Sequence, residues 1–223
     1  MKRIFQYIWH FFYVAIHWNI WLAFFTLYHD LKGGIRYGID TFNREELHNL
    51  TLSEGDLSLA SPYEPINYYM LEDLLRQFRK RSPLRTLVDL GSGKGRVLVV
   101  AGYFGFTNIT GIDMAKELCD LAKQNVRKKE TLFPDVQWTV IHDNVVNYGI
   151  RKDDSVFFMF NPFRQAVIQR FLENLDASLR QYPRKTWFLY ASPVHADLLI
   201  EHGYHVVYEK QVLNLQSMIL TRD

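Results

Sequence analysis

The sequence predicts an α/β fold, in which a mostly parallel seven-stranded sheet carries helices on both faces and ends in a C-terminal antiparallel hairpin. From about residue 62 to the C-terminus, short apolar runs alternate with amphipathic helical stretches, the pattern of strands joined by crossover helices. A glycine-rich turn at residues 89–95 follows the first apolar run and precedes a helical stretch. The last two apolar runs lie too close together for a crossover helix, so they are expected to pair as a hairpin.

The order of the elements follows from this alternation. Apolar runs separated by helical stretches are predicted to form parallel strands at residues 86–90, 109–112, 136–141, 155–160 and 186–191. Helices are predicted before, between and after them, at residues 63–80, 96–104, 115–130, 165–182 and 194–202. Residues 204–213 and 216–221 complete the sheet as the terminal hairpin.

Polar residues stand at the ends of the first four predicted strands. They are Asp89, Asp113, Asp143 and Asn161. Because ligands of such sheets bind beyond the carboxyl ends of the strands, these four side chains are expected to converge on one crevice. Each alone would be an ordinary turn residue, whereas the four together with the glycine-rich turn indicate a binding site.

The glycine-rich turn could hold a dinucleotide or S-adenosylmethionine, and two residues separate these ligands. Asp89 lies two residues before the first glycine, where a carboxylate would repel the pyrophosphate of a dinucleotide. Arg96 stands where the third glycine of the dinucleotide-binding pattern would be. S-adenosylmethionine has no phosphate and carries an ammonium group that a carboxylate can pair with. The turn therefore favours S-adenosylmethionine over the cofactor of an NAD-linked oxidoreductase. Lys94 does not fit the spacing of a phosphate-binding loop and is expected to be exposed.

Four motifs of the chain resemble those of the class I S-adenosylmethionine-dependent methyltransferases, which have a Rossmann-like fold. The motifs are Asp89-Leu-Gly-Ser-Gly-Lys-Gly95, Gly111-Ile-Asp113, His142-Asp143-Asn144 and Asn161-Pro-Phe163. The resemblance covers about residues 60–223 and is most specific at the first motif.

The resemblance implies how the cofactor would be held. Asp89 would pair with its ammonium group, Asp113 would accept hydrogen bonds from both ribose hydroxyls, and Asp143 would accept one from the adenine amino group. Further contacts are implied at Gly91, Ser92, Gly93, Met114, Asn144 and Tyr63. The alternatives are that Met114 only begins the next helix and that Asp143 only caps a turn.

The motif at the end of the fourth predicted strand concerns the methyl acceptor. Asn161-Pro-Phe163 resembles the [DNS]-P-P-[YF] motif of amino-group methyltransferases with one proline missing, which implies catalytic roles for Asn161 and Phe163. The alternative is a loop end followed by a helix-starting proline. Tyr63-Glu-Pro65 is similar to the segment that covers the cofactor in protein-lysine methyltransferases with a D-L-G-S-G turn, although it would also suit a helix N-terminus. An O-methyltransferase acting on a small molecule and a non-catalytic membrane assembly factor that binds the cofactor remain alternatives.

The N-terminal segment differs from the rest of the chain. Residues 4–28 contain no Asp, Glu, Lys or Arg, and 11 of these 25 residues are aromatic. As one helix the segment would be about 37 Å long, enough to cross a bilayer core of roughly 30 Å. A polar stripe of Gln6, His10, Tyr13 and His17 and the three tryptophans instead favour a helix in the membrane interface. A span with its N-terminus outside, or a helical arm packed on the domain or in an oligomer, remains an alternative.

These observations give the expected organisation of the chain. Residues 1–38 form an apolar aromatic helix that Gly33, Gly34 and Gly38 end, residues 39–61 form a connector, and residues 62–223 form the methyltransferase-like domain. The net charge of +2 gives no case for nucleic acid, and no Cys/His cluster suggests a metal. The single cysteine, Cys119, fits a reducing cytoplasmic setting. We therefore expect a cytoplasmic, membrane-associated protein whose acceptor is a protein or lipid amine.

Overall fold

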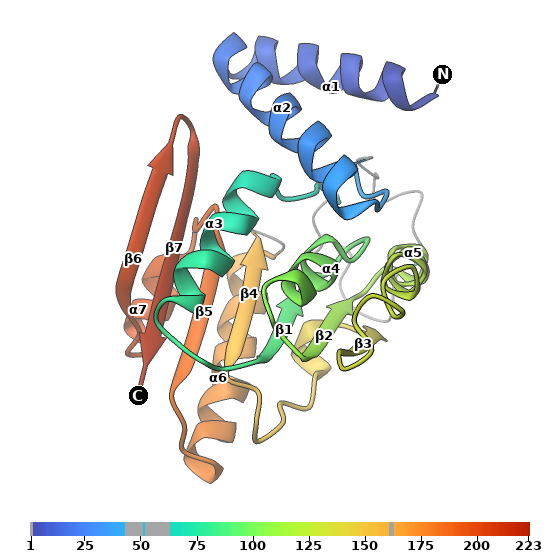
Figure 1. Cartoon of the computed structure of the whole chain (residues 1–223). Helices are drawn as coiled ribbons and strands as arrows, with labels where there is room; N and C mark the ends of the chain where they lie inside the picture. The colour runs from blue at the N-terminus through green and yellow to red at the C-terminus, as the bar shows by residue number, and fades with distance from the viewer. Residues whose placement is uncertain (1, 43–50, 52–62, 161–162) are drawn as a thin grey trace.

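The computed structural model describes residues 2–42, 51, 63–160 and 163–223 (Figure 1). The helices are α1 Lys2–His17, α2 Ile20–Tyr37, α3 Tyr68–Arg79, α4 Arg96–Tyr103, α5 Lys116–Arg127, a short 3-10 helix Val145–Asn147, α6 Gln165–Gln181 and α7 Ala196–Glu201. The strands are β1 Thr86–Leu90, β2 Asn108–Asp113, β3 Gln137–His142, β4 Val156–Phe160, β5 Thr186–Ala191, β6 His205–Val212 and β7 Leu215–Arg222. Of the predicted connector, only residues 39–42 and 51 are described.

The strands form one seven-stranded sheet in the order β3-β2-β1-β4-β5-β7-β6. Strands β1 to β5 run parallel to one another, and β7 pairs antiparallel with both β5 and β6. The predicted mostly parallel sheet with a terminal hairpin is confirmed. β1 and β4 are neighbours although two strands separate them in sequence, so the strand order changes direction beside β1. That is the place where such sheets bind ligands.

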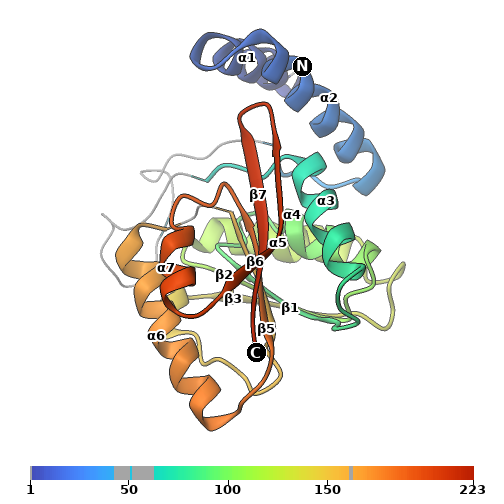
Figure 2. The ribbon, with the colours of Figure 1, turned by 90° about the vertical axis from the view of Figure 1, so that its left-hand side faces the viewer.

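Helices cover both faces of the sheet (Figure 2). Leu71 of α3, Val99 of α4 and Val126 of α5 belong to one buried apolar cluster. Phe171 of α6 and Leu199 of α7 belong to a second cluster on the opposite face. The central strands are buried on both faces and therefore read as continuous apolar runs, as is typical of parallel strands.

The N-terminal segment is two helices and not one. α1 and α2 form a hairpin, the helical arm (residues 2–37), which lies beyond the same edge of the sheet as the carboxyl ends of β1, β2 and β4 (Figure 1). The prediction of one continuous helix is wrong because Asn19 adopts an extended conformation and its side chain accepts the backbone N–H of Leu22 at 2.8 Å. Among the described residues, no helix combines the length and hydropathy needed to cross a membrane.

Gly33 and Gly34 do not end the second helix, contrary to prediction. α2 continues to Tyr37 and is capped by Gly38, whose φ is 61°. A Cβ at Gly33 would lie 2.2 Å from the ring of Tyr68, the first residue of α3. Gly33 therefore lets the arm approach the domain, and it does so without interrupting the helix.

Replacing these two adjacent glycines by alanine is expected to have opposite effects on stability. Gly33→Ala should lower the free energy of unfolding by about 1–3 kcal/mol because the new methyl group overlaps Tyr68. Gly34→Ala should raise it by up to about 1 kcal/mol, since alanine favours a helix and the nearest atom to its Cβ, the hydroxyl of Tyr7, lies 3.7 Å away. Urea denaturation of both variants measures this. Equal shifts in the same direction would show that the arm does not pack on Tyr68.

Candidate cofactor site

The glycine-rich turn leaves β1 with three residues in the left-handed region. Gly91, Gly93 and Gly95 have φ of 81°, 52° and 78°. The backbone N–H groups of Gly91 and Ser92 both donate to the carbonyl of Ile112 in β2, each at 2.9 Å. These bonds hold the turn against the end of the neighbouring strand, with the backbone conformation that only glycine adopts readily.

Asp113, at the end of β2, shapes the turn as well as flanking it. One carboxylate oxygen accepts the backbone N–H of Gly93 at 2.7 Å, and the other accepts that of Ala115 at 2.9 Å. Burial raises the pKa of Asp113, and these two hydrogen bonds oppose the rise. The sequence predicted Asp113 only as a ligand of the cofactor, and not as an acceptor that fixes the backbone of the turn.

Asp89 is the least satisfied acid of the site. Its side chain is 2% exposed, and its Oδ2 is buried without a hydrogen-bond partner among the described residues. Burial raises the pKa of Asp89 well above its ordinary value, and the neighbouring Asp113 raises it further. The buried Oγ of Ser92 also lacks such a partner. A ligand with an ammonium group and further donors fits these orphaned acceptors.

The end of β3 lies beside the end of β2, as predicted. The N–H of Asp143 donates to the carbonyl of Asp113 at 3.0 Å. One oxygen of the Asp143 carboxylate accepts the N–H of Asn144 at 2.6 Å and the side-chain amide of Asn147 at 3.0 Å. Asn144 caps the 3-10 helix by accepting the N–H of Val146 at 3.2 Å. Asp143 and Asn144 therefore have local structural roles beside the implied cofactor site. Met114, which directly follows β2, is half-buried.

The end of β4 is described only in part. Asn161 lies outside the described residues, so its predicted catalytic role is not placed by the structure. Phe163 is half-buried and packs against the apolar cluster under α6. Its aromatic ring is therefore anchored near the carboxyl end of β4, and its catalytic role stays a prediction.

Tyr63 lies directly against the glycine-rich turn. α3 begins at Tyr68, later than predicted, because Asn67 caps it by accepting the N–H of Tyr69 at 2.9 Å. Tyr63 therefore lies ahead of the helix. A Cβ at Gly93 would lie 2.2 Å from its ring, and its hydroxyl donates to the carbonyl of Thr41 at 2.9 Å.

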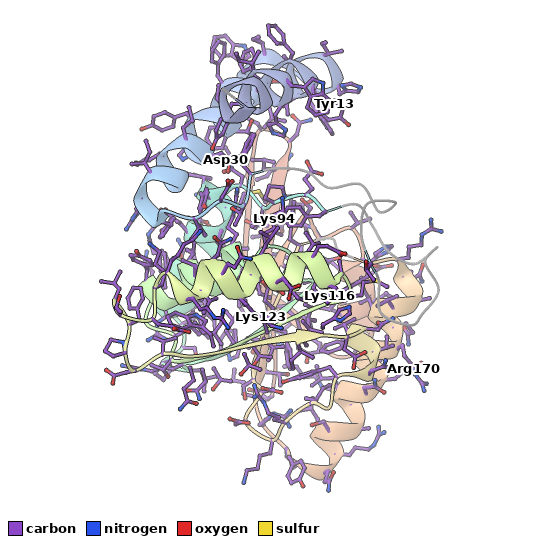
Figure 3. All side chains as sticks on the ribbon, turned by 90° about the vertical axis from the view of Figure 1, so that its right-hand side faces the viewer. Tyr13, Asp30, Lys94, Lys116, Lys123 and Arg170 are labelled. Carbon is purple, nitrogen blue, oxygen red and sulfur yellow. The ribbon has the colours of Figure 1, made fainter. Side chains whose placement is uncertain are left out.

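Lys94 was predicted to be exposed, and this prediction is wrong. The residue is buried, and its ammonium lies 5.0 Å from the centre of the Tyr63 ring. Its backbone carbonyl accepts the side-chain amide of Asn125 at 3.0 Å, which ties the turn to α5. Figure 3 shows Lys94 between α5 and the helical arm. The ring of Tyr63, in the described segment before α3, therefore covers the end of this lysine.

Arg96 joins the turn to the helical arm. Its buried guanidinium donates to Asp30 of α2 at 2.7 Å, to the hydroxyl of Thr41 at 2.8 Å and to the carbonyl of Ile66. The guanidinium carbon of Arg96 lies 4.1 Å from the centre of the Tyr68 ring. From the sequence, Arg96 was notable only because it stands where a dinucleotide-binding turn would have a glycine. Its partner lies 66 residues away in the chain, so no local pattern signals the pair.

The fold is that of the S-adenosylmethionine-dependent methyltransferases. A proposed RNA methyltransferase from Pyrococcus horikoshii is similar at a TM-score of 0.60 and 14% identity, over 86% of this chain and 96% of that one. The magnesium protoporphyrin IX methyltransferase of Synechocystis, with S-adenosylmethionine bound, has a TM-score of 0.51 at 14% identity, over 69% of this chain and 77% of that one. The ribosomal protein L11 methylase of Lactobacillus delbrueckii has a TM-score of 0.51 at 15% identity, over 75% and 83%.

These similarities establish the architecture. No protein-family profile matches the sequence, and no curated protein matches it. The three similar structures are described as acting on RNA, a porphyrin and a ribosomal protein, so one fold carries very different acceptors. The particular resemblance to protein-lysine methyltransferases rests on the sequence motif alone.

Proposed function

We propose that the protein is an S-adenosylmethionine-dependent methyltransferase. The observation that carries this proposal is the buried Asp89 carboxylate, which has an oxygen without a described partner beside a glycine-rich turn at the strand-order switch. A dinucleotide would bring a pyrophosphate to this acid, whereas S-adenosylmethionine would bring an ammonium group.

The residues of the site have complementary roles in this proposal. S-adenosylmethionine, when bound, supplies a methyl group activated on a sulfonium ion. Asp89 would hold its ammonium group, Asp113 its ribose hydroxyls and Asp143 its adenine amino group. The carboxylate of Asp113 is already fixed by two backbone N–H groups and keeps further lone pairs for a ligand. This carboxylate is therefore preorganised for the ligand. Transfer of the methyl group then depends on aligning and desolvating the acceptor.

We propose that the acceptor is an amine of a protein or lipid at the cytoplasmic side of a membrane. The Asn161-Pro-Phe163 sequence at the end of β4 supports a nitrogen acceptor, because an amide oxygen and an aromatic ring suit an amine that becomes cationic. The apolar helical arm, which lies beyond the same edge of the sheet, supports a membrane setting. Methylation of a small-molecule hydroxyl and cofactor binding without catalysis are the alternatives that the following experiment separates.

The experiment supplies tritiated S-adenosylmethionine and the purified protein to membranes from cells that lack it. Lipid and protein are then separated, and each fraction is treated with base, which releases label from methyl esters but not from methylated amines. We expect base-stable label in one of the two fractions, and its loss when Asn161→Ala replaces the wild type although the cofactor still binds. The base-stable label is then identified by chromatography as a methylated amine or a methyl ether. Base-labile label, label in a methyl ether, or label only in small soluble molecules would contradict an amine acceptor. Absence of cofactor binding by calorimetry would contradict the proposal as a whole.

A further inference from the structure

The helical arm presents an apolar stripe along each of its helices. On α1 the exposed large apolar residues are Ile8, Trp9, Phe12 and Ile16, and on α2 they are Ile20, Trp21, Phe24, Tyr28, Leu31 and Ile35. Both sets follow helical spacing, so each set covers an arc of about 100° around its helix axis. The most exposed members are Ile35 at 84% and Ile16 at 77%. Exposed stripes of this length exceed the scattered apolar residues of an ordinary surface.

The two stripes join into one surface. The ring of Phe11 contacts Phe12 on α1 at 5.6 Å and Phe24 on α2 at 4.9 Å, both measured between ring centres. The opposite side of α2 is buried and includes Thr26, Asp30, Gly33 and Tyr37. α2 thus packs on the domain with the face opposite its apolar stripe. The stripes of both helices remain exposed at the end of the molecule (Figures 1 and 3).

The helices that carry this surface have a net positive charge. Residues 1–37 contain four basic residues, Lys2, Arg3, Lys32 and Arg36, and one acid, Asp30. Asp30 is buried and paired with Arg96, so it does not offset the basic residues at the surface. Lys32 and Arg36 follow the apolar stripe of α2 along one side, as their helical positions require, and Arg36 also contacts Glu72 at 3.4 Å. The surface therefore combines apolar contact with attraction to negative charge.

We propose that this surface docks the protein on an anionic lipid bilayer, with α1 and α2 lying in the interface. Tryptophan and tyrosine prefer the boundary between headgroups and acyl chains, and Trp9, Trp21 and Tyr28 are exposed within the stripes. The α2 stripe spans 15 residue steps from Ile20 to Ile35, or about 23 Å, and no charged residue interrupts it. A helix pair with one apolar face and basic borders is the form of an interfacial anchor.

The test measures sedimentation of the full chain with vesicles of phosphatidylcholine, alone or mixed with phosphatidylglycerol. We expect binding to the mixed vesicles that weakens as salt is raised, because headgroup attraction is screened. Trp21→Glu and Ile35→Glu should each lower the partition coefficient at least tenfold, which corresponds to about 1.4 kcal/mol. The matched control is Leu132→Glu, at a residue 56% exposed outside the arm, which should bind as the wild type does.

The outcomes separate the alternative occupants of this surface. Circular dichroism and the denaturation midpoint establish that each variant is folded, as expected for residues this exposed. Failure of the wild type to bind mixed vesicles at low salt would overturn the proposal. It would also be overturned if Trp21→Glu changed a dimer into a monomer without any lipid binding, since the occupant would then be a second copy. Lipid binding is measured without cofactor, so its failure leaves the methyl-transfer experiment unaffected.

Discussion

Replacing Asp89 by asparagine is expected to stabilise the protein and to weaken its binding of S-adenosylmethionine. The carboxylate is buried and one of its oxygens has no described partner, so the folded protein bears a desolvation cost that a neutral amide reduces. We expect the free energy of unfolding without cofactor to rise by about 1–3 kcal/mol at neutral pH. The affinity for the cofactor should fall at least tenfold, because the ammonium group loses its charged partner.

The same variant has a predicted pH dependence. The pKa of Asp89 is raised in the folded state, so the unfolded chain releases this proton at a lower pH than the folded protein does. Below the ordinary pKa of aspartate, Asp89 therefore does not lower the free energy of unfolding. As pH rises toward the raised pKa of the folded state, Asp89 lowers the free energy of unfolding by a growing amount. The stability advantage of Asp89→Asn should grow over the same window and then level off. Cofactor binding in that window should release a proton from wild-type Asp89, which calorimetry in buffers of different ionisation enthalpy detects.

Asp154 provides the matched control for Asp89. It is equally buried, but its carboxylate accepts from the hydroxyl of Tyr148 at 2.8 Å and from the backbone and guanidinium of Arg151. It precedes β4 and so lies at the edge of the sheet away from the glycine-rich turn. Asp154→Asn should lower stability and leave cofactor affinity unchanged. If Asp89→Asn behaved in this way too, Asp89 would be a structural residue and the cofactor assignment would fail.

Removing the carboxylate of Asp30 is expected to destabilise the protein strongly, by far more than the loss of an exposed ion pair would. Asp30→Ala leaves the buried guanidinium of Arg96 without its charged partner, and breaking one side of a buried ion pair costs about 3–5 kcal/mol. Because Arg96 begins α4 directly after the glycine-rich turn, the variant should also bind S-adenosylmethionine less tightly. Denaturant titration and calorimetry measure the two effects separately.

Two further variants test the origin of this effect. Asp120 pairs with Lys116 at the same 2.7 Å distance, but both side chains are exposed, so Asp120→Ala should hardly change the denaturation midpoint. The double variant Asp30→Leu with Arg96→Met replaces the pair by apolar side chains and should recover much of the lost stability. A double variant as unstable as Asp30→Ala would show that the remaining contacts of Arg96, and not its charge, dominate.

The sheet and its ligand-binding edge could be predicted because their signals are local. The inner strands β1, β4 and β5 are apolar runs buried on both faces, and the first four predicted strands each end at a polar residue. The parallel sheet then brings Asp89, Asp113 and Asp143 together without further information. Their hydrogen bonds were not predicted, because the N–H groups that Asp113 accepts belong to a turn whose conformation depends on the assembled strands.

The helical arm was predicted less well because its structure depends on distant residues. A run of 25 residues without a charged side chain favoured one helix, but the cap at Asn19 divides it. Gly33 looked like a helix end, whereas the ring of Tyr68 explains its presence inside the helix. Lys94 was expected at the surface, but it is buried beside Tyr63. The burial of Arg96 depends on its contacts with Asp30 and Thr41, which are distant in sequence. Composition indicated the character of the arm, and only tertiary contacts determined its shape.

The distance in sequence between Asp30 and Arg96 also determines when the two residues can pair during synthesis. The two residues are 66 positions apart, and at about 5–20 residues per second the arm emerges roughly 3–13 s before its partner. During that interval Asp30 has no Arg96 to pair with, and the aromatic stripes are already made. Contacts within the arm, such as that of Phe11 with Phe24, can form during that interval, whereas pairing of the arm with the first residue of α4 cannot.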